Sequence, residues 1–85
     1  MTRDDVFAAI TAERKRQWAK WGRIHEWGHG DCSSPGMAPE IKMTVLAEEF
    51  GEVARAVLDR KPGDLRTELI QVAAVAVAWL EGLPE

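Results

Sequence analysis

Three carboxylates lie close together in a segment whose apolar residues are expected to pack in a hydrophobic core. Residues 46–53, LAEEFGEV, contain Glu48, Glu49 and Glu52 among leucine, phenylalanine and valine. At about 100° per residue the apolar residues share one stripe of a helix. Glu49 and Glu52 lie together on its shoulder, and Glu48 points further round toward solvent. Carboxylates at the edge of a core lose hydration and raise one another's pKa unless a positive charge neutralises them, so the pattern indicates a cation-binding site.

A second polar pair has the same three-residue spacing. Glu68 and Gln71 lie in an otherwise apolar segment, which the short link RKPGD at residues 60–64 joins to the first. Helices joined by so short a link pack as an antiparallel hairpin, in which residues at equal depth have numbers with a constant sum. Glu52 then lies level with Glu68. Glu49 lies level with Gln71, about one helical turn away, so the hairpin should build a box of three carboxylates and one amide.

The donor atoms of this box favour a hard cation. Carboxylate and amide oxygens without cysteine or paired histidine are typical ligands of Mg²⁺, with Mn²⁺ as a second candidate, rather than of zinc. Mg²⁺ commonly completes its coordination with substrate phosphates, so the expected ligand is a phosphate ester or anhydride. The alternative is a solvated helix face, on which the glutamates pair with Arg55, Arg60 and Arg66.

Three helices should position these groups. The predicted helices span about residues 4–20, 39–59 and 64–81, separated by a loop rich in Gly, Ser and Pro and by the short link. No alternating pattern is long enough to predict a strand. The expected fold is therefore all-α, a helical bundle that forms a single domain over residues 1–85.

Helix ends and core faces follow from residue types. Thr2 or Asp4 is expected to cap the first helix. Proline suits the first helical position, so the second helix should begin near Pro39, and Asp64 should cap the third. The residues expected to face the core are Phe7, Ile10, Trp18 and Trp21 in the first helix and Leu46, Phe50, Val53 and Val57 in the second.

The third helix lacks a polar face. From Leu69 to Leu80 its only polar side chain is Gln71, and a helix that is apolar all round is buried on all sides. Two other helices of one short chain cannot easily surround it. We therefore expect a homodimer in which helices of two copies form one bundle.

Composition narrows the choice of partners. The chain has 85 residues and a formal net charge of −3, which is unlike the basic character of general nucleic-acid binders. The single cysteine, Cys32, permits no intrachain disulfide and fits a reducing compartment. The N-terminus lacks a signal-peptide layout, and the longest apolar run, residues 72–80, is too short to span a bilayer. We expect a cytoplasmic protein with no nucleic-acid and no membrane partner.

The first helix supplies candidate substrate-binding groups. Arg14 lies within its apolar stripe and Gln17 on the shoulder, and a core-facing arginine needs an anionic partner. We expect Arg14 and Lys20 to contact substrate phosphates and Gln17 to contact a base or sugar. Alternatively, Arg14 pairs with Glu13 or with another carboxylate nearby.

Aromatic residues and histidines follow at the end of this helix and in the loop. Trp21 and, secondarily, Trp27 can stack on a nucleobase, although such tryptophans often cover a core edge instead. His25 counts among the expected substrate-binding residues, in a mobile loop that covers the substrate. The alternative is a zinc site at His25, His29 and Cys32, whose fourth ligand would be Asp31 or solvent.

The acidic motifs also resemble those of a known family. EEFGE at residues 48–52, followed by ELIQ at 68–71, resembles the EExxE…ExxD signature of the MazG-like all-α nucleoside triphosphate pyrophosphohydrolases. The intervening DRKPGDLRT and the following VAAVAVAW resemble the short phage and bacterial members, and ERKRQWAKWG at 13–22 is similar to the start of the family's domain. The resemblance is strong over residues 45–80 and weaker before them.

The resemblance implies a Mg²⁺-dependent enzyme that hydrolyses a nucleoside triphosphate between its α- and β-phosphates to a monophosphate and pyrophosphate. It implies a dimeric or tetrameric bundle and a catalytic role for Glu48 in orienting the attacking water. The implied metal ligands are Glu49, Glu52, Glu68 and Gln71. Gln71 departs from the family's Asp and brings no charge, so the alternative is a non-catalytic helical interaction module, a degenerate relative of the family.

Overall fold

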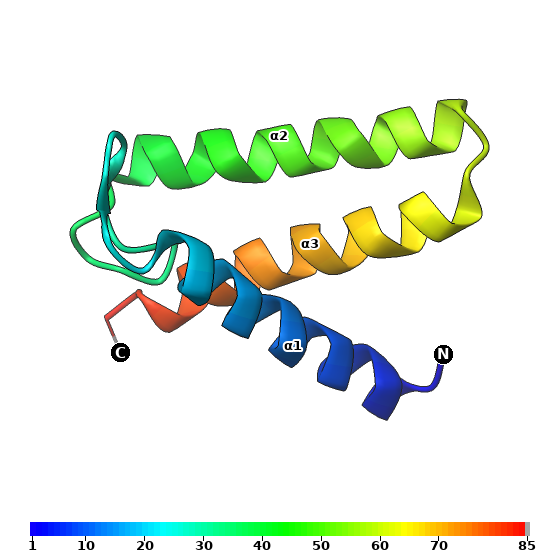
Figure 1. Ribbon diagram of the computed structural model, residues 1–85, viewed down its shortest axis with the longest axis horizontal. Coiled ribbons are helices and arrows are strands. Elements are labelled where there is room, and N and C mark those ends of the chain that lie inside the picture. Colours follow the sequence, from blue (N-terminus) through cyan, green and yellow to red (C-terminus); the bar gives the residue numbers. More distant parts are fainter. Residues whose placement is uncertain (85) are drawn as a thin grey trace.

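The computed structural model describes residues 1–84 and confirms the all-α class (Figure 1). Its three helices are α1 (Arg3–Trp21), α2 (Pro39–Leu58) and α3 (Pro62–Glu81), and two short strands, β1 (Ile24–His25) and β2 (Gly28–His29), lie between α1 and α2. Within the described chain, no helix combines the length and the apolar character that crossing a bilayer requires.

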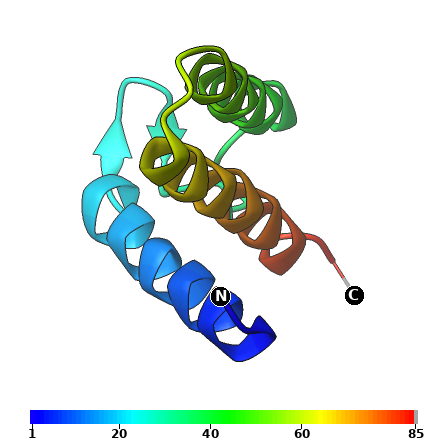
Figure 2. The same cartoon turned by 90° about the vertical axis from the view of Figure 1, so that its right-hand side faces the viewer.

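Helix α3 is the centre of the fold. It packs against α2 along an antiparallel hairpin and against α1 on another side, so that α1 and α2 share few direct contacts (Figures 1 and 2). The side chains at the centre are small: Ala74 and Ala78 are completely buried, next to Val75 and Cys32. Alanines let two helices approach closely, and this approach determines which polar side chains of α2 and α3 meet.

The first helix begins as its sequence predicts. The Thr2 hydroxyl accepts a hydrogen bond from the Asp5 amide, and the Asp5 carboxylate accepts one from the Thr2 amide, both at 3.1 Å. This reciprocal capping box satisfies two backbone donors that a helix N-terminus otherwise leaves unpaired. It confirms Thr2, rather than Asp4, as the cap.

The turn between α2 and α3 differs from the expectation that Asp64 caps the third helix. The Lys61 amide donates to the Ala56 carbonyl and the Arg60 amide to the Val57 carbonyl, each at 3.2 Å, in the pattern of a Schellman motif. This turn brings the chain straight back into a helix at Pro62, whose fixed φ suits a first helical position. Asp64 therefore lies inside the first turn of α3 and does not cap it.

Several apolar side chains expected in the core are exposed in the single chain. Phe50 is 67% and Phe7 59% exposed, and Val57 and Trp18 are also exposed. The expectation that they face the core of one chain is wrong because α3 covers only one side of α2, and α1 crosses α3 instead of lying along the hairpin (Figure 1). Leu69 and Leu80 of α3 are exposed for the same reason.

A minimal hairpin lies in the loop where no strand was expected. Ile24 pairs with His29 and His25 with Gly28 in an antiparallel register. Gly28 and Gly30 adopt positive φ angles of 140° and 96°, which side chains disfavour. Strands of two residues are too short to show an alternating pattern, so their presence depends on these glycine turns rather than on periodicity.

Position 60 should tolerate glycine with a gain in stability. Arg60 has a φ of 54° at the position of the Schellman motif where glycine is normally found. We expect Arg60→Gly to raise the free energy of unfolding by about 1 kcal/mol, since the left-handed conformation costs other residues about 1–2 kcal/mol. Urea titration at fixed protein concentration measures this. Arg60→Ala keeps the strain and serves as control, and an equal gain in both variants would contradict the explanation.

Candidate functional site

Three carboxylates meet where α2 and α3 pack together. One oxygen each from Glu49, Glu52 and Glu68 lies within 4.8 Å of the others. Glu49 and Glu68 are partly buried, whereas Glu52 is exposed. The predicted juxtaposition of the two helices' acidic side chains is therefore confirmed, and within residues 1–84 no other group of three or more His, Cys, Asp or Glu side chains is placed to hold a metal ion.

Gln71 completes the box on the α3 side. In the amide orientation that satisfies its hydrogen bonds, its nitrogen donates to Glu49 Oε2 at 2.9 Å and to Glu68 Oε2 at 2.8 Å. The amide thus partly neutralises two carboxylates from within the protein. In this orientation its nitrogen, not its oxygen, faces the carboxylates, so a metal-ligand role for Gln71 requires the amide to rotate.

The crowding perturbs proton binding by the cluster. Burial, together with the hydrogen bonds and charges of Glu52 and Glu49, raises the pKa of Glu68 to about 7. Burial and the charges of Glu52 and Glu13 raise the pKa of Glu49 as well. The cluster is therefore expected to lose its proton at a higher pH than exposed glutamates do. Its all-oxygen donors also fit a hard cation such as Mg²⁺, which could take the proton's place.

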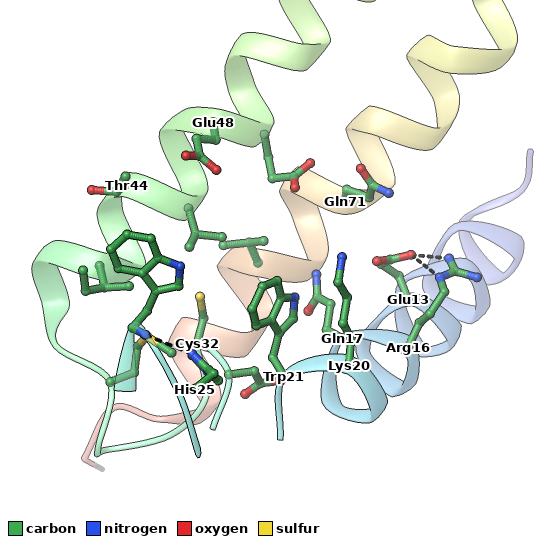
Figure 3. A pocket seen from close by; sticks show the side chains of 17 residues that line it. Glu13, Arg16, Gln17, Lys20, Trp21, His25, Cys32, Thr44, Glu48 and Gln71 are labelled. Atoms are coloured by element: carbon green, nitrogen blue, oxygen red, sulfur yellow. Dashed lines mark hydrogen bonds and ion pairs between the residues drawn. The ribbon is translucent and has the colours of Figure 1, made fainter. Parts of the chain in front are cut away.

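The cluster borders a cavity of about 510 Å³ between α1, the loop and α2 (Figure 3). Glu48, Glu49 and Gln71 lie in the wall formed by α2 and α3. Glu52 and Glu68 instead line a smaller hollow of about 160 Å³ beside Arg55. The carboxylates thus separate two hollows, and a cation held by all three would lie at the edge of the larger one.

Helix α1 forms the opposite wall of the larger cavity with Glu13, Arg16, Gln17 and Lys20 (Figure 3). Glu13 is only 6% exposed and pairs with Arg16, whose Nε donates to Glu13 Oε1 at 2.9 Å. The Lys20 ammonium lies 5.1 Å from the centre of the Trp21 ring, in a cation–π contact. This wall carries positive charge and hydrogen-bond donors, opposite the acidic wall of α2.

Arg14 lies behind this wall rather than in it. Its guanidinium donates to Asp31 Oδ2 at 2.7 Å, to Glu81 Oε1 at 2.9 Å and to Gln17 Oε1 at 2.9 Å. Burial alone would raise the pKa of Asp31, but hydrogen bonds from Ser33 and Arg14 outweigh it and lower that pKa. Of the two expectations for Arg14, pairing with a nearby carboxylate is confirmed. Among the cavity-lining side chains Arg14 is absent, so it does not meet a ligand there directly.

The aromatic end of the cavity contains Trp21, His25 and Trp27. His25 Nε2 hydrogen-bonds the Gly30 carbonyl at 2.7 Å, and its Nδ1 accepts from the Trp27 amide at 3.2 Å. The ring therefore carries its proton on Nε2, and both nitrogens are used to hold the hairpin together. His25 lines the cavity by its ring surface, and it packs edge-on against Trp21 with ring centres 5.1 Å apart.

The alternative zinc site is not supported by this geometry. Both His25 nitrogens are engaged, and His25, His29 and Cys32 are not among the groups that converge on one point within residues 1–84. Burial and the Asp31 charge raise the pKa of the Cys32 thiol, which disfavours the thiolate that zinc requires. Cys32 is a core residue that also borders the cavity.

Sequence reasoning missed part of this site. Glu13 was considered only as a partner of Arg14, yet it is a buried wall residue that pairs with Arg16. Asp31 and Met37, both buried, line the cavity from the loop, where no periodic pattern could assign them a side. An acidic residue on an otherwise core-facing helix surface was the one available signal for Glu13.

The chain matches no protein-family model, and no curated protein or solved structure matches it either.

The proton on Glu68 makes stability depend on pH. Because folding raises this pKa from the ordinary value of 4.5 to about 7, the stabilisation is complete below pH 4.5 and is lost as pH rises through 7. We expect the free energy of unfolding without metal to fall between these pH values. Glu68→Gln should remove most of the fall, whereas Glu40→Gln, outside the cluster, should not. Urea titrations from pH 4.5 to 8 measure both.

Mg²⁺ should reverse this loss at high pH. At pH 8 and 100 times its dissociation constant, a cation bound to the folded state alone adds about 2.7 kcal/mol. We expect a gain of this order for the wild type, a smaller one at pH 5, where protons compete, and little for Glu68→Gln. Equal gains in stability for the wild type at pH 8, the wild type at pH 5 and Glu68→Gln would mean that the cation binds outside the cluster.

Proposed function

We propose that the protein is a Mg²⁺-dependent nucleoside triphosphate pyrophosphohydrolase, a hydrolase acting on phosphoric anhydrides. The observation that carries this proposal is the convergence of Glu49, Glu52 and Glu68 at the edge of a cavity large enough for a nucleotide. The resemblance of the EEFGE and ELIQ segments to the MazG-like signature supports the same activity. The reaction converts a (d)NTP and water into a (d)NMP and pyrophosphate.

The two walls of the cavity suit the two needs of phosphoryl transfer, charge neutralisation and a positioned water. Bound Mg²⁺, with Mn²⁺ as a substitute, would offset the negative charge of the phosphates. Arg16 and Lys20 on the α1 wall can bind phosphate oxygens directly. Glu48, exposed on the α2 wall, can accept a hydrogen bond from the attacking water and orient it.

The other end of the cavity suits a nucleoside. Trp21 and Trp27 offer flat apolar faces, and Ile41 and Met37 continue the apolar lining. Base–aromatic stacking is typically worth about 1–3 kcal/mol per base. A nucleotide bound this way has its base among the aromatic residues and its phosphates toward the carboxylate cluster.

We further propose that the chain works as a homo-oligomer. No large side chain within residues 1–84 is completely buried, and exposed apolar residues such as Phe50, Leu58 and Leu80 lie on the helices. Small single chains bury a limited share of their surface, and contact between copies would cover these side chains. A dimer or a tetramer would satisfy this requirement.

Loss of the metal ligands should abolish turnover. With Mg²⁺ and a panel of NTPs and dNTPs, we expect pyrophosphate release, and we expect Glu49→Gln and Glu52→Gln to lower kcat/KM by about 100-fold or more. Glu40→Gln, outside the cluster on the same helix, is the matched control and should keep its activity. No pyrophosphate from any nucleotide would count against the proposal.

One observation favours a second function, that of a non-catalytic interaction module. Gln71 donates to both Glu49 and Glu68, so the box is partly neutralised without a cation. An amide that takes the place of a fourth carboxylate is consistent with a domain that no longer needs metal. In that case the apolar helix faces would serve only to bind other helices.

Gln71→Asp distinguishes the two functions. If the cluster binds metal, a fourth carboxylate should tighten Mg²⁺ or Mn²⁺ binding by about tenfold, since it adds both charge and a ligand oxygen. If the cluster is only structural, the variant should lose stability at pH 8 and bind no metal, because two hydrogen bonds are replaced by repulsion. Calorimetric Mn²⁺ titration of wild type and variant, with Glu40→Gln as control, measures the difference. Unchanged or weaker Mn²⁺ binding would contradict the enzyme proposal.

A further inference from the structure

The amide of Gln17 has a fixed orientation in the cavity wall. Its oxygen accepts a hydrogen bond from Arg14 Nη1 at 2.9 Å. A guanidinium can only donate, so the atom facing Arg14 has to be the oxygen and cannot be the nitrogen. Arg14 is itself held in place by Asp31 and Glu81, and its side chain is 13% exposed.

The Gln17 nitrogen is consequently presented to the cavity. Figure 3 shows it pointing from α1 toward the wall formed by α2 and α3, next to Lys20. Among the described residues 1–84 no side chain or carbonyl accepts a hydrogen bond from it, and it is not sealed in the core as an unpaired group. Gln17 therefore offers a ligand two N–H donors and no acceptor, although a glutamine in solution offers both.

The surroundings of this donor include an aromatic ring as well as the Lys20 ammonium. Gln17 is four residues, about one helical turn, before Trp21, whose ring lines the same cavity. The neighbouring Asp31 also lines the cavity, where its Oδ1 accepts two hydrogen bonds from Ser33 and its Oδ2 accepts one from Arg14. A base stacked on the aromatic residues would thus meet a donor at this point of the wall.

We propose that the Arg14–Gln17 pair makes the site select nucleobases that present a carbonyl oxygen over those that present an amino group. This inference rests on the proposed function, since it assumes a nucleotide in the cavity. A carbonyl oxygen pairs with the Gln17 N–H group, whereas an exocyclic amine sets donor against donor and leaves both unpaired. Gln17 is the specificity-determining residue, and Arg14 is a positioning residue that acts through it.

Two substrate pairs isolate this effect. dUTP and dCTP differ at the C4 substituent and the adjacent ring nitrogen, and dITP and dATP differ in the same way at C6, with a carbonyl in the first of each pair and an amine in the second. We expect kcat/KM of the wild type to favour the carbonyl member of at least one pair by about tenfold or more. In Gln17→Glu, one carboxylate oxygen can stay with Arg14, and the other can accept a hydrogen bond from a base amine. The ratio of kcat/KM between the carbonyl and the amine member of a pair should therefore fall to one or invert. The added charge weakens every triphosphate alike and cancels in the ratio.

A positioning role for Arg14 has its own readout. Arg14→Met frees the Gln17 amide to rotate, so the ratio should approach one even where total activity persists. Glu81→Gln removes the charge of an exposed partner of Arg14 and leaves the bond to Gln17, so it should keep the wild-type ratio. If Arg14→Met does not fold, Gln17→Glu and Glu81→Gln still decide the proposal.

The outcomes separate this inference from the proposed function. Turnover with equal ratios in wild type and Gln17→Glu overturns the base selection and leaves the pyrophosphohydrolase intact. No turnover of any nucleotide overturns the proposed function, and the affinities of dUMP and dCMP, measured by calorimetry with Mg²⁺, then test the selection directly. A tenfold preference for dUMP that Gln17→Glu removes supports it. Equal affinities, or no binding of either, overturn it.

Discussion

The repulsion among three carboxylates, imposed by the packing of α2 on α3, is the constraint on which the rest of this structure depends. Val45 and Leu46 of α2 pack against the buried cluster that contains Val75 and Ala78 of α3, and Glu49, Glu52 and Glu68 lie within 4.8 Å of one another across the same pair of helices. Burial of apolar surface supplies the free energy that holds the charges there. The Gln71 amide reduces the cost, and the raised pKa of Glu68, about 7, lets proton uptake reduce it further below that pH. The cation site that we propose would supply the positive charge that these three carboxylates lack.

The position of α3 decides what lies next to this cluster. Because α3 contacts both other helices, α1 and α2 are held apart on either side of it (Figure 2). The cavity of about 510 Å³ lies between them. The α2 wall of the cavity is acidic and the α1 wall carries donors and positive charge. Our proposal of a nucleotide ligand rests on these opposed walls and on the aromatic residues at one end of the cavity.

The same arrangement explains the exposed apolar residues. A central helix with neighbours on two sides leaves its remaining faces, and the outer face of α2, without cover. The apolar character of α3 all round was visible in the sequence, and the single chain does not bury it completely. Oligomerisation remains our proposal for these faces, since a second copy of the same chain would bring apolar helix faces of its own to cover them.

The sequence alone determined the helices and the level pairing across the hairpin, because both follow from local rules: apolar periodicity, capping residues and the short link between two helices. Those rules located Glu49, Glu52, Glu68 and Gln71 correctly. They could not predict the partners of Arg14, because Asp31 and Glu81 come from distant parts of the chain. They also could not predict that the nitrogens of His25 form hydrogen bonds within a hairpin, because that hairpin has no periodic signal. Which face of each helix is covered was likewise decided only by the tertiary structure, since the crossing of α1 over α3 depends on packing between segments far apart in sequence.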